Sequence, residues 1–161
     1  MTRLKDLTDQ FRRTLSVGAV QQALLLTEEE LTQSAKVLRV AGEHAAVATS
    51  LIKQGNIRRM LDDHGRAIAA YTEALTAAER AGDKRQQAES LSGKAKAEFS
   101  RGQLDQAMRD AEQAVPLALA SGQKDALSSA YGSARPLTYG MPARASLSSA
   151  SLQATARPWR P

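Results

Sequence analysis

Two histidines and one pair of adjacent acids are the residues whose types most readily suggest chemistry: His44, His64, Asp62 and Asp63. A shared metal ion requires ligands that converge, but twenty helical residues would separate the two histidines by about 30 Å. Adjacent aspartates in a turn rarely direct both carboxylates at one point, which acid–base catalysis by a pair requires. We therefore predict no metal site and no catalytic dyad.

The other reactive residue types form no catalytic pattern. The 10 glycines stand singly, so the sequence has no glycine-rich phosphate loop. The serines lack the spacing of a nucleophile elbow, and the absence of cysteine excludes disulfides and thiolate metal sites. The sequence predicts a protein that is not an enzyme and that requires no cofactor.

Positive charge is concentrated near the C-terminal end. The 161 residues include 22 Lys and Arg against 17 Asp and Glu, which gives a formal net charge of +5. Up to Asp125 the basic and acidic residues number 18 and 17. No acid occurs after it, and four arginines follow: Arg135, Arg144, Arg157 and Arg160. The body is therefore nearly neutral, and the basic character belongs to a tail.

The sequence lacks the patterns of a secretory signal and of a membrane span. Residues 1–10 alternate charged and apolar residues. The densest apolar run, residues 23–26, is far shorter than the roughly 20 residues that cross a bilayer. We expect a soluble, cytoplasmic protein with no membrane partner.

An internal repeat of forty residues organises most of the chain. Shifting the sequence by forty aligns large apolar residues and glycines from residue 11 to residue 131. A fixed period of this length indicates stacked structural repeats. The aligned sets include Gly42, Gly82 and Gly122; Phe11, Leu51, Leu91 and Tyr131; and Leu31, Tyr71 and Ala111.

Each unit has the pattern of two helices. First helices are predicted over 45–61 and 86–101, and second helices over 66–80 and 105–120, because apolar residues recur there at three- and four-residue spacings. Many of these residues are small, which allows neighbouring helices to pack closely. The predicted core faces are Ala48, Leu51, Gly55, Ala88, Leu91 and Ala95 on the first helices, and Ala67, Tyr71, Ala74, Leu75, Ala78, Ala107, Ala111, Ala114, Val115 and Ala118 on the second.

The small and aromatic residues of these units follow a known spacing. Gly102, Leu104 and Ala107 match the first half of a repeat motif, and Ala67, Tyr71, Ala74 and Leu75 match its second half. Over residues 2–135 the sequence resembles the tetratricopeptide repeat family, in a longer variant of about forty residues. The resemblance implies an all-α fold, a right-handed superhelical stack of antiparallel helix pairs (an alpha-solenoid) with about seven helices.

The repeat register divides the chain into a repeat domain and a tail. Residues 1–135 would form units over 2–41, 42–81 and 82–121, each of two helices, and a capping helix over 122–135 with Ser133 on its outer side. The tail, 136–161, is basic and rich in Pro, Ser and Ala. We predict that it is disordered or a non-native ending, which would make the chain a fragment of a longer array.

Three local signals predict where helices begin and end. In the first unit, Thr27 and Glu30 form a capping-box pattern, which predicts the start of a second helix. Pro116 lies within a predicted helix, where it predicts a kink or an early end. Pro136 is expected to stop the capping helix at Arg135.

The resemblance also implies a binding groove on the concave side of the stack, lined by the first helices. In the family this groove commonly holds an extended peptide or a helix of a partner. Asn56 can bond a peptide backbone and Lys96 a carboxylate. Met60 and Phe99 are either exposed contacts or part of the hairpin core. The candidate contacts are Thr49, Lys53, Asn56, Arg59, Glu89, Lys96 and Phe99, with Ile52, Met60, Ser92 and Ser100 beside them.

Two functions from different classes are consistent with the sequence. We predict a non-enzymatic scaffold that binds a peptide or helix of a partner protein, as a segment of a larger bacterial regulatory protein, and self-association stays open. The alternative is a nucleic-acid-associated module in which the four tail arginines contact phosphates and Trp159 stacks on a base.

Overall fold

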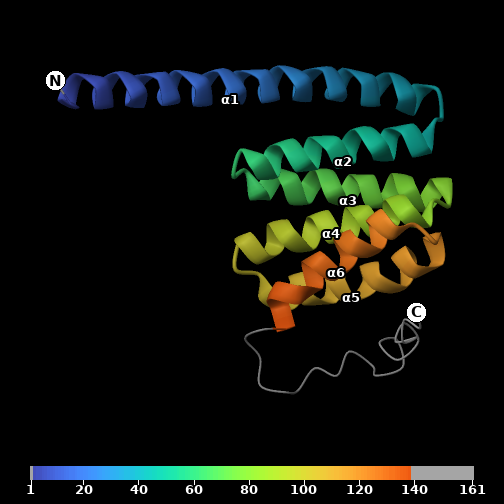
Figure 1. The fold of residues 1–161 in the computed structure, drawn as a ribbon. Coiled ribbons are helices and arrows are strands. Elements are labelled where there is room, and N and C mark those ends of the chain that lie inside the picture. Colours follow the sequence, from blue (N-terminus) through green and yellow to red (C-terminus); the bar gives the residue numbers. More distant parts are fainter. Residues whose placement is uncertain (1, 139–161) are drawn as a thin grey trace, which may run out of the picture.

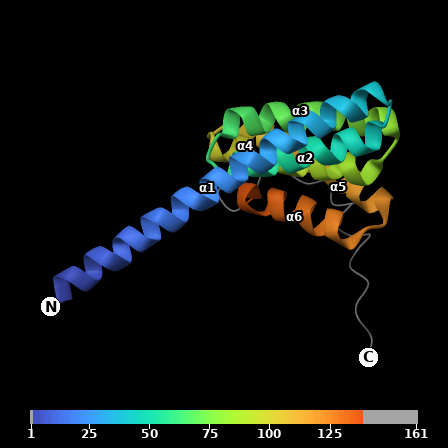
Figure 2. The same ribbon diagram turned by 90° about the horizontal axis from the view of Figure 1, so that it is seen from above.

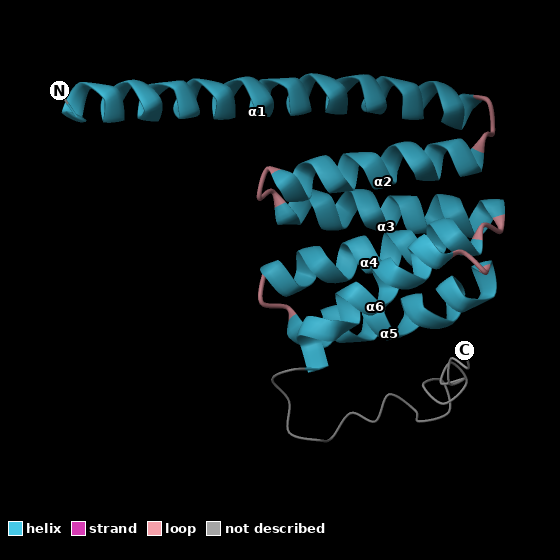
Figure 3. Ribbon diagram, viewed as in Figure 1, coloured by secondary structure: helices cyan, strands magenta, loops and turns pink. Residues whose placement is uncertain are grey.

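The computed structural model describes residues 2–138, which form six helices joined by short turns (Figures 1 and 3). The described part contains no strand, so the all-α prediction is confirmed. The helices are α1 (Thr2–Val40), α2 (His44–Met60), α3 (His64–Ala81), α4 (Lys84–Ser100), α5 (Leu104–Ser121) and α6 (Lys124–Thr138). The helices predicted for the second and third units agree with α2 to α5 within about two residues at each end.

The helices stack in chain order as antiparallel pairs, and the two sides of the stack differ. Each helix contacts the next, and in addition α2 contacts α4 and α4 contacts α6. By contrast, α3 and α5 do not contact each other within the described residues. The first helices of successive pairs are therefore closer together than the second helices, which makes their side the concave one.

Turns with left-handed backbone separate the helices at repeating positions. Gly42, Gly82 and Gly122 have φ angles of 74°, 68° and 67°, and they lie at the boundaries between units, at intervals of forty residues. Within the units, the corresponding turn residues are Asp62, with φ 58°, and Gly102, with φ 76°. Glycine adopts this conformation without steric cost, whereas Asp62 does so with mild strain.

Replacing Asp62 with glycine is expected to stabilise the protein by about 0.5 kcal/mol, because relief of the strained φ outweighs the greater freedom of glycine in the unfolded chain. The matched change Gly102→Ala places a side chain at the same kind of position and should destabilise by about 1 kcal/mol. Urea unfolding of both variants measures the difference. Equal shifts in the same direction would contradict this interpretation.

The core consists mainly of alanines packed around one tyrosine. The predicted core faces are confirmed: all their members are buried except Leu75, which is half-buried. Tyr71 is 0% exposed, and its ring lies between the backbones of Gly55 and Gly93. A Cβ atom built at either glycine would lie 2.6 Å or 2.4 Å from the ring, so only glycine fits on both sides.

The first unit is not a pair of helices, and the expected seven helices are six. Residues 2–40 form the single helix α1, whose N-terminal part extends beyond the stack (Figures 1 and 2). The position equivalent to Asp62 and Gly102 is occupied by Gln22, which does not favour a left-handed turn. The capping box predicted at Thr27 is also wrong, because its hydroxyl donates to the carbonyl of Ala23 inside α1.

Neither proline ends a helix where the sequence predicted. The early end expected at Pro116 is wrong, because α5 continues to Ser121. Pro116 lies on the exposed side, while Val115 and Ala118 beside it are buried and keep the helix packed. The stop expected at Pro136 is also wrong, because α6 ends at Thr138. Residues 139–161 of the predicted tail lie outside the described part of the chain.

The side of α6 that packs against the preceding pair differs from the prediction at Ser133. Ala126 and Ala130 are both 0% exposed, and Ser133 is 4% exposed. Ser133 had been expected on the outer side, but its hydroxyl is satisfied by donation to the carbonyl of Ala130, which permits burial. These three residues lie on one helix face and pack against the preceding pair.

Candidate partner-binding groove

A cavity of about 300 Å³ opens on the concave side where α2, α4 and α6 meet. Four of the seven predicted contacts line it, two from α2 and two from α4. The cavity therefore brings together residues that are distant in sequence, as a binding site on stacked repeats requires. Its lining residues are Ile52, Asn56, Arg59, Glu89, Gly93, Lys96, Asp125 and Ser129.

Two cations in this cavity repel each other. Burial lowers the pKa of Lys96, and the positive charge of Arg59 lowers it further. Within the described residues, neither Arg59 nor Lys96 has an acidic partner within 4.0 Å, and the buried Nε atom of Arg59 has no hydrogen-bond partner. Lys96 Nζ donates to Ser129 Oγ, at 3.2 Å. Such a pair of cations is suited to receiving an anionic group.

Hydrogen bonds fix the neighbouring side chains. The hydroxyl of Tyr71 donates to Asn56 Oδ1 at 2.7 Å, which leaves the amide nitrogen of Asn56 to donate elsewhere. Burial raises the pKa of Tyr71, so this hydroxyl stays protonated. Nearer the other end of α4, Gln86 Nε2 donates to Thr49 Oγ1 at 2.8 Å and to the carbonyl of Ala45. Thr49 therefore links α2 to α4 and does not line the cavity.

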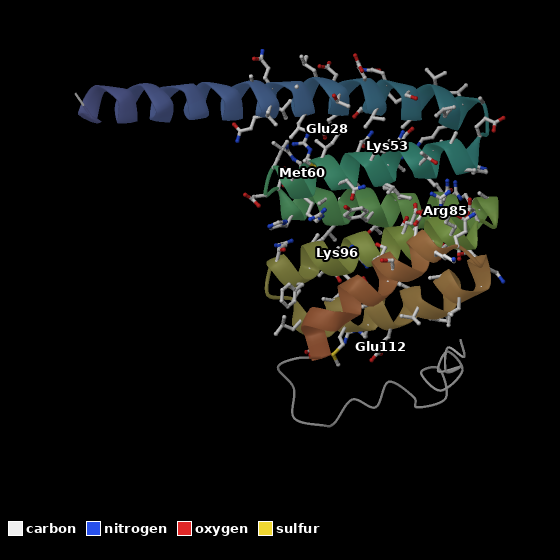
Figure 4. The ribbon with its side chains drawn as sticks, viewed as in Figure 1. Glu28, Lys53, Met60, Arg85, Lys96 and Glu112 are labelled. Atoms are coloured by element: carbon white, nitrogen blue, oxygen red, sulfur yellow. The ribbon has the colours of Figure 1, made fainter. Side chains whose placement is uncertain are left out.

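The remaining predicted contacts lie outside the cavity. Lys53 of α2 is exposed and does not line the cavity, unlike Lys96 of α4 (Figure 4). Phe99 is 42% exposed and Met60 is 62% exposed, so neither is enclosed in the hairpin core. Ser92, which stood beside the predicted contacts, is fully buried.

Sequence reasoning missed the contribution of α6. Asp125 and Ser129 line the cavity, and Ser129 stands forty residues after Glu89 and eighty after Thr49. The repeat register therefore contained the signal for Ser129, although the helix over 122–135 was expected only to cap the stack. Glu89, which occupies the same repeat position as Ser129, forms an ion pair with Arg85 at 2.9 Å.

A second group of charges is buried between α4 and α5. Lys94 Nζ lies 2.9 Å from Asp110 Oδ2 and 3.6 Å from Glu98 Oε1. Glu98 is 2% exposed and Asp110 is 4% exposed. Burial, and then the charge of Asp110, raise the pKa of Glu98 from 4.5 to about 7. Because these charges are buried between two packed helices, we expect them to affect stability.

The two histidines first considered for chemistry lie apart, although His64 Nε2 is 3.9 Å from Asp62 Oδ1. His44 and His64 begin successive antiparallel helices, α2 and α3. In the described part of the chain, no three His, Cys, Asp or Glu side chains are arranged to hold a metal ion. None of the helices in that part combines the length and apolarity that crossing a bilayer requires. Of the four tail arginines only Arg135 lies in a described helix.

Comparison with known families agrees with this architecture. Residues 46–120, which include all of α3 and α4 and most of α2 and α5, match the family model described as tetratricopeptide repeat. No curated protein was found to be similar to the chain. Domains of the matching family generally mediate protein–protein interactions and are typically not enzymes. The resemblance to the tetratricopeptide repeat family is therefore confirmed over residues 46–120.

Proposed function

We propose that the protein binds an extended peptide segment of a partner protein in the concave groove, and that the cavity between α2, α4 and α6 receives an acidic side chain of that segment. The observation that carries the proposal is the pair Arg59 and Lys96, two cations in one cavity that have no acidic partner within 4.0 Å among the described residues. A carboxylate would remove the repulsion between them and form charge-assisted hydrogen bonds.

The other lining residues support a peptide as the ligand. The amide of Asn56 has a free donor for a backbone carbonyl. Ile52 offers an apolar surface at the edge of the cavity. Asp125 and Glu89 discourage a densely negative ligand such as a nucleic acid, because each adds a negative charge close to the two cations. The groove thus favours a single acid within a mixed sequence.

Selection from a library of 12-residue peptides displayed on phage, with the full chain as target, tests the proposal. The selected peptides should share one Asp or Glu, and synthetic versions with an amidated C-terminus should still bind. Changing that acid to its amide should weaken binding about tenfold to a hundredfold, because hydrogen bonds to charged groups contribute about 1.5–3 kcal/mol. Isothermal titration measures the affinities.

Two variants of the protein provide the matched comparison. Lys96→Gln should lower the affinity for the synthetic peptide by a similar factor. Lys53→Gln, which changes an exposed lysine of α2 outside the cavity, should leave the affinity unchanged. With the amide form of the peptide, Lys96→Gln should have no further effect. Selected peptides without an acid, or peptides that bind only with a free C-terminal carboxylate, would refute the proposed side-chain recognition.

A further inference from the structure

The side of the stack opposite the concave groove carries a second groove, between α1 and α3. Both helices pack against α2, but within the described residues their backbones do not approach each other closely. Two cavities, of about 310 Å³ and 420 Å³, follow one another between them. The two cavities share Arg39 of α1 and Glu73 of α3, which form an ion pair across the groove.

Small apolar residues form the floor of this groove. In the first cavity these are Ala35, Leu51, Ala69 and Ala70, and in the second Val47 and Ala77. Gln54 lines the first cavity, and its amide nitrogen is buried with no hydrogen-bond partner in the described part of the chain. The floor can therefore receive an apolar surface, and a buried donor beside it lacks an acceptor.

Basic side chains outnumber acids along both edges. The groove is lined by five basic residues, Lys36, Arg39, Arg58, Arg66 and Arg80, but by only two acids, Glu28 and Glu73. The two acids are already paired, Glu28 with Arg58 and Glu73 with Arg39. Within the described residues, Lys36 and Arg80 have no ion pair, and Arg66 has only Asp63, the residue that caps the start of α3, at 3.6 Å. The groove has an excess of positive charge.

The spacing of the charges suits a helix. Arg66, Glu73 and Arg80 follow each other at intervals of seven residues, so they lie on one face of α3 and span about 21 Å. This is the length of about four helical turns. An amphipathic helix could lay its apolar face on the alanine floor and direct acids at the two edges.

We propose that the groove between α1 and α3 binds an acidic amphipathic helix of a second protein, independently of the concave site. Arg66 and Arg80 receive acids from one edge of that helix, and Lys36 receives an acid from the other. The ion pair between Arg39 and Glu73 does not block the groove, because both side chains are more than half exposed and exposed pairs contribute little to stability. An incoming carboxylate can replace Glu73 as the partner of Arg39.

A synthetic peptide tests the proposal: an 18-residue helix of Leu, Ala and Glu, with Leu on one face and Glu along both edges. Its binding is followed by amide NMR shifts of the full chain carrying Lys96→Gln, so that the concave cavity does not contribute. We expect the largest shifts around Lys36, Arg66 and Arg80, and at least a tenfold loss of affinity in Arg66→Gln/Arg80→Gln. The control Lys84→Gln/Lys124→Gln removes two exposed lysines outside the groove and should change affinity less than twofold.

The remaining outcomes would overturn the proposal. Equal loss in both double variants would mean that net charge alone attracts the peptide. Shifts confined to α4 and α6 would place it elsewhere on the molecule. A peptide with Lys in place of Glu that binds equally well would exclude recognition of acids. Displacement of the peptide by a 20-base-pair DNA duplex at lower concentration would assign the groove to nucleic acid. Circular dichroism of each variant verifies that the helices remain folded.

Discussion

Replacing Gly93 with alanine is expected to destabilise the protein by about 2–3 kcal/mol, the cost of overpacking a tight core. The added Cβ would lie 2.4 Å from the ring of Tyr71, which is fully buried and cannot withdraw. At an ordinary helical position the same substitution usually stabilises by up to about 1 kcal/mol. A loss of stability, where a gain is usual, would therefore indicate the close contact. Urea unfolding followed by circular dichroism measures the change in the free energy of unfolding.

Three further variants separate overpacking from any other effect of the new methyl group. Gly132→Ala in α6, where a Cβ meets nothing within 4 Å, should be neutral or stabilising. Tyr71→Ala alone should cost about 3–5 kcal/mol by leaving a cavity, but Gly93→Ala added to it should cost little or restore stability. Additive losses in the double variant would show that Tyr71 and Gly93 are not in contact.

Replacing Lys94 with methionine is expected to cost about 3 kcal/mol at pH 8, because it leaves Glu98 and Asp110 buried together without their cation. The loss should be smaller at pH 5.5. Since the pKa of Glu98 is about 7, this side chain takes up a proton in the folded protein below that pH, and one of the two buried negative charges disappears. Chemical unfolding at the two pH values measures both losses.

The raised pKa of Glu98 also affects how the stability of the unmodified protein depends on pH. The pKa of Glu98 is about 7 in the folded state against 4.5 ordinarily, so between these values the folded state retains a proton that the unfolded state has lost. The contribution of Glu98 to stability therefore falls as pH rises from about 4.5 to 7. Glu98→Gln should remove this dependence and make the protein more stable at pH 8. An unchanged slope in Glu98→Gln would assign the pH dependence to another group.

The helical pairs could be predicted because their signal is local and repeated. Apolar residues at three- and four-residue spacings locate α2 to α5, and glycines at intervals of forty locate the turns between units. The continuous helix α1 was not predicted, although one residue carries the reason. Gln22 occupies the place of a left-handed turn residue, and the alignment of the neighbouring apolar residues concealed this substitution.

The site could be predicted only in part, because its geometry depends on how helices pack. The repeat register placed Asn56, Arg59, Glu89 and Lys96 on one side, and the structure brings these four into one cavity. The register alone could not show that α6 closes this cavity. It also could not show that Lys94, Glu98 and Asp110 are buried together, because charged residues on helices normally face solvent.

The tyrosine between two glycines also bears on the order of the repeats. Stacked units with similar surfaces can pair out of sequence while the chain folds. Tyr71 belongs to one unit, but Gly93 belongs to the next, so the contact exists only when the third unit follows the second. The residue equivalent to Gly93 in the second unit is Lys53, and in α6 it is Ser133, so neither could accept the ring in the same way. The contact between Tyr71 and Gly93 thus specifies the third unit as the correct neighbour of the second.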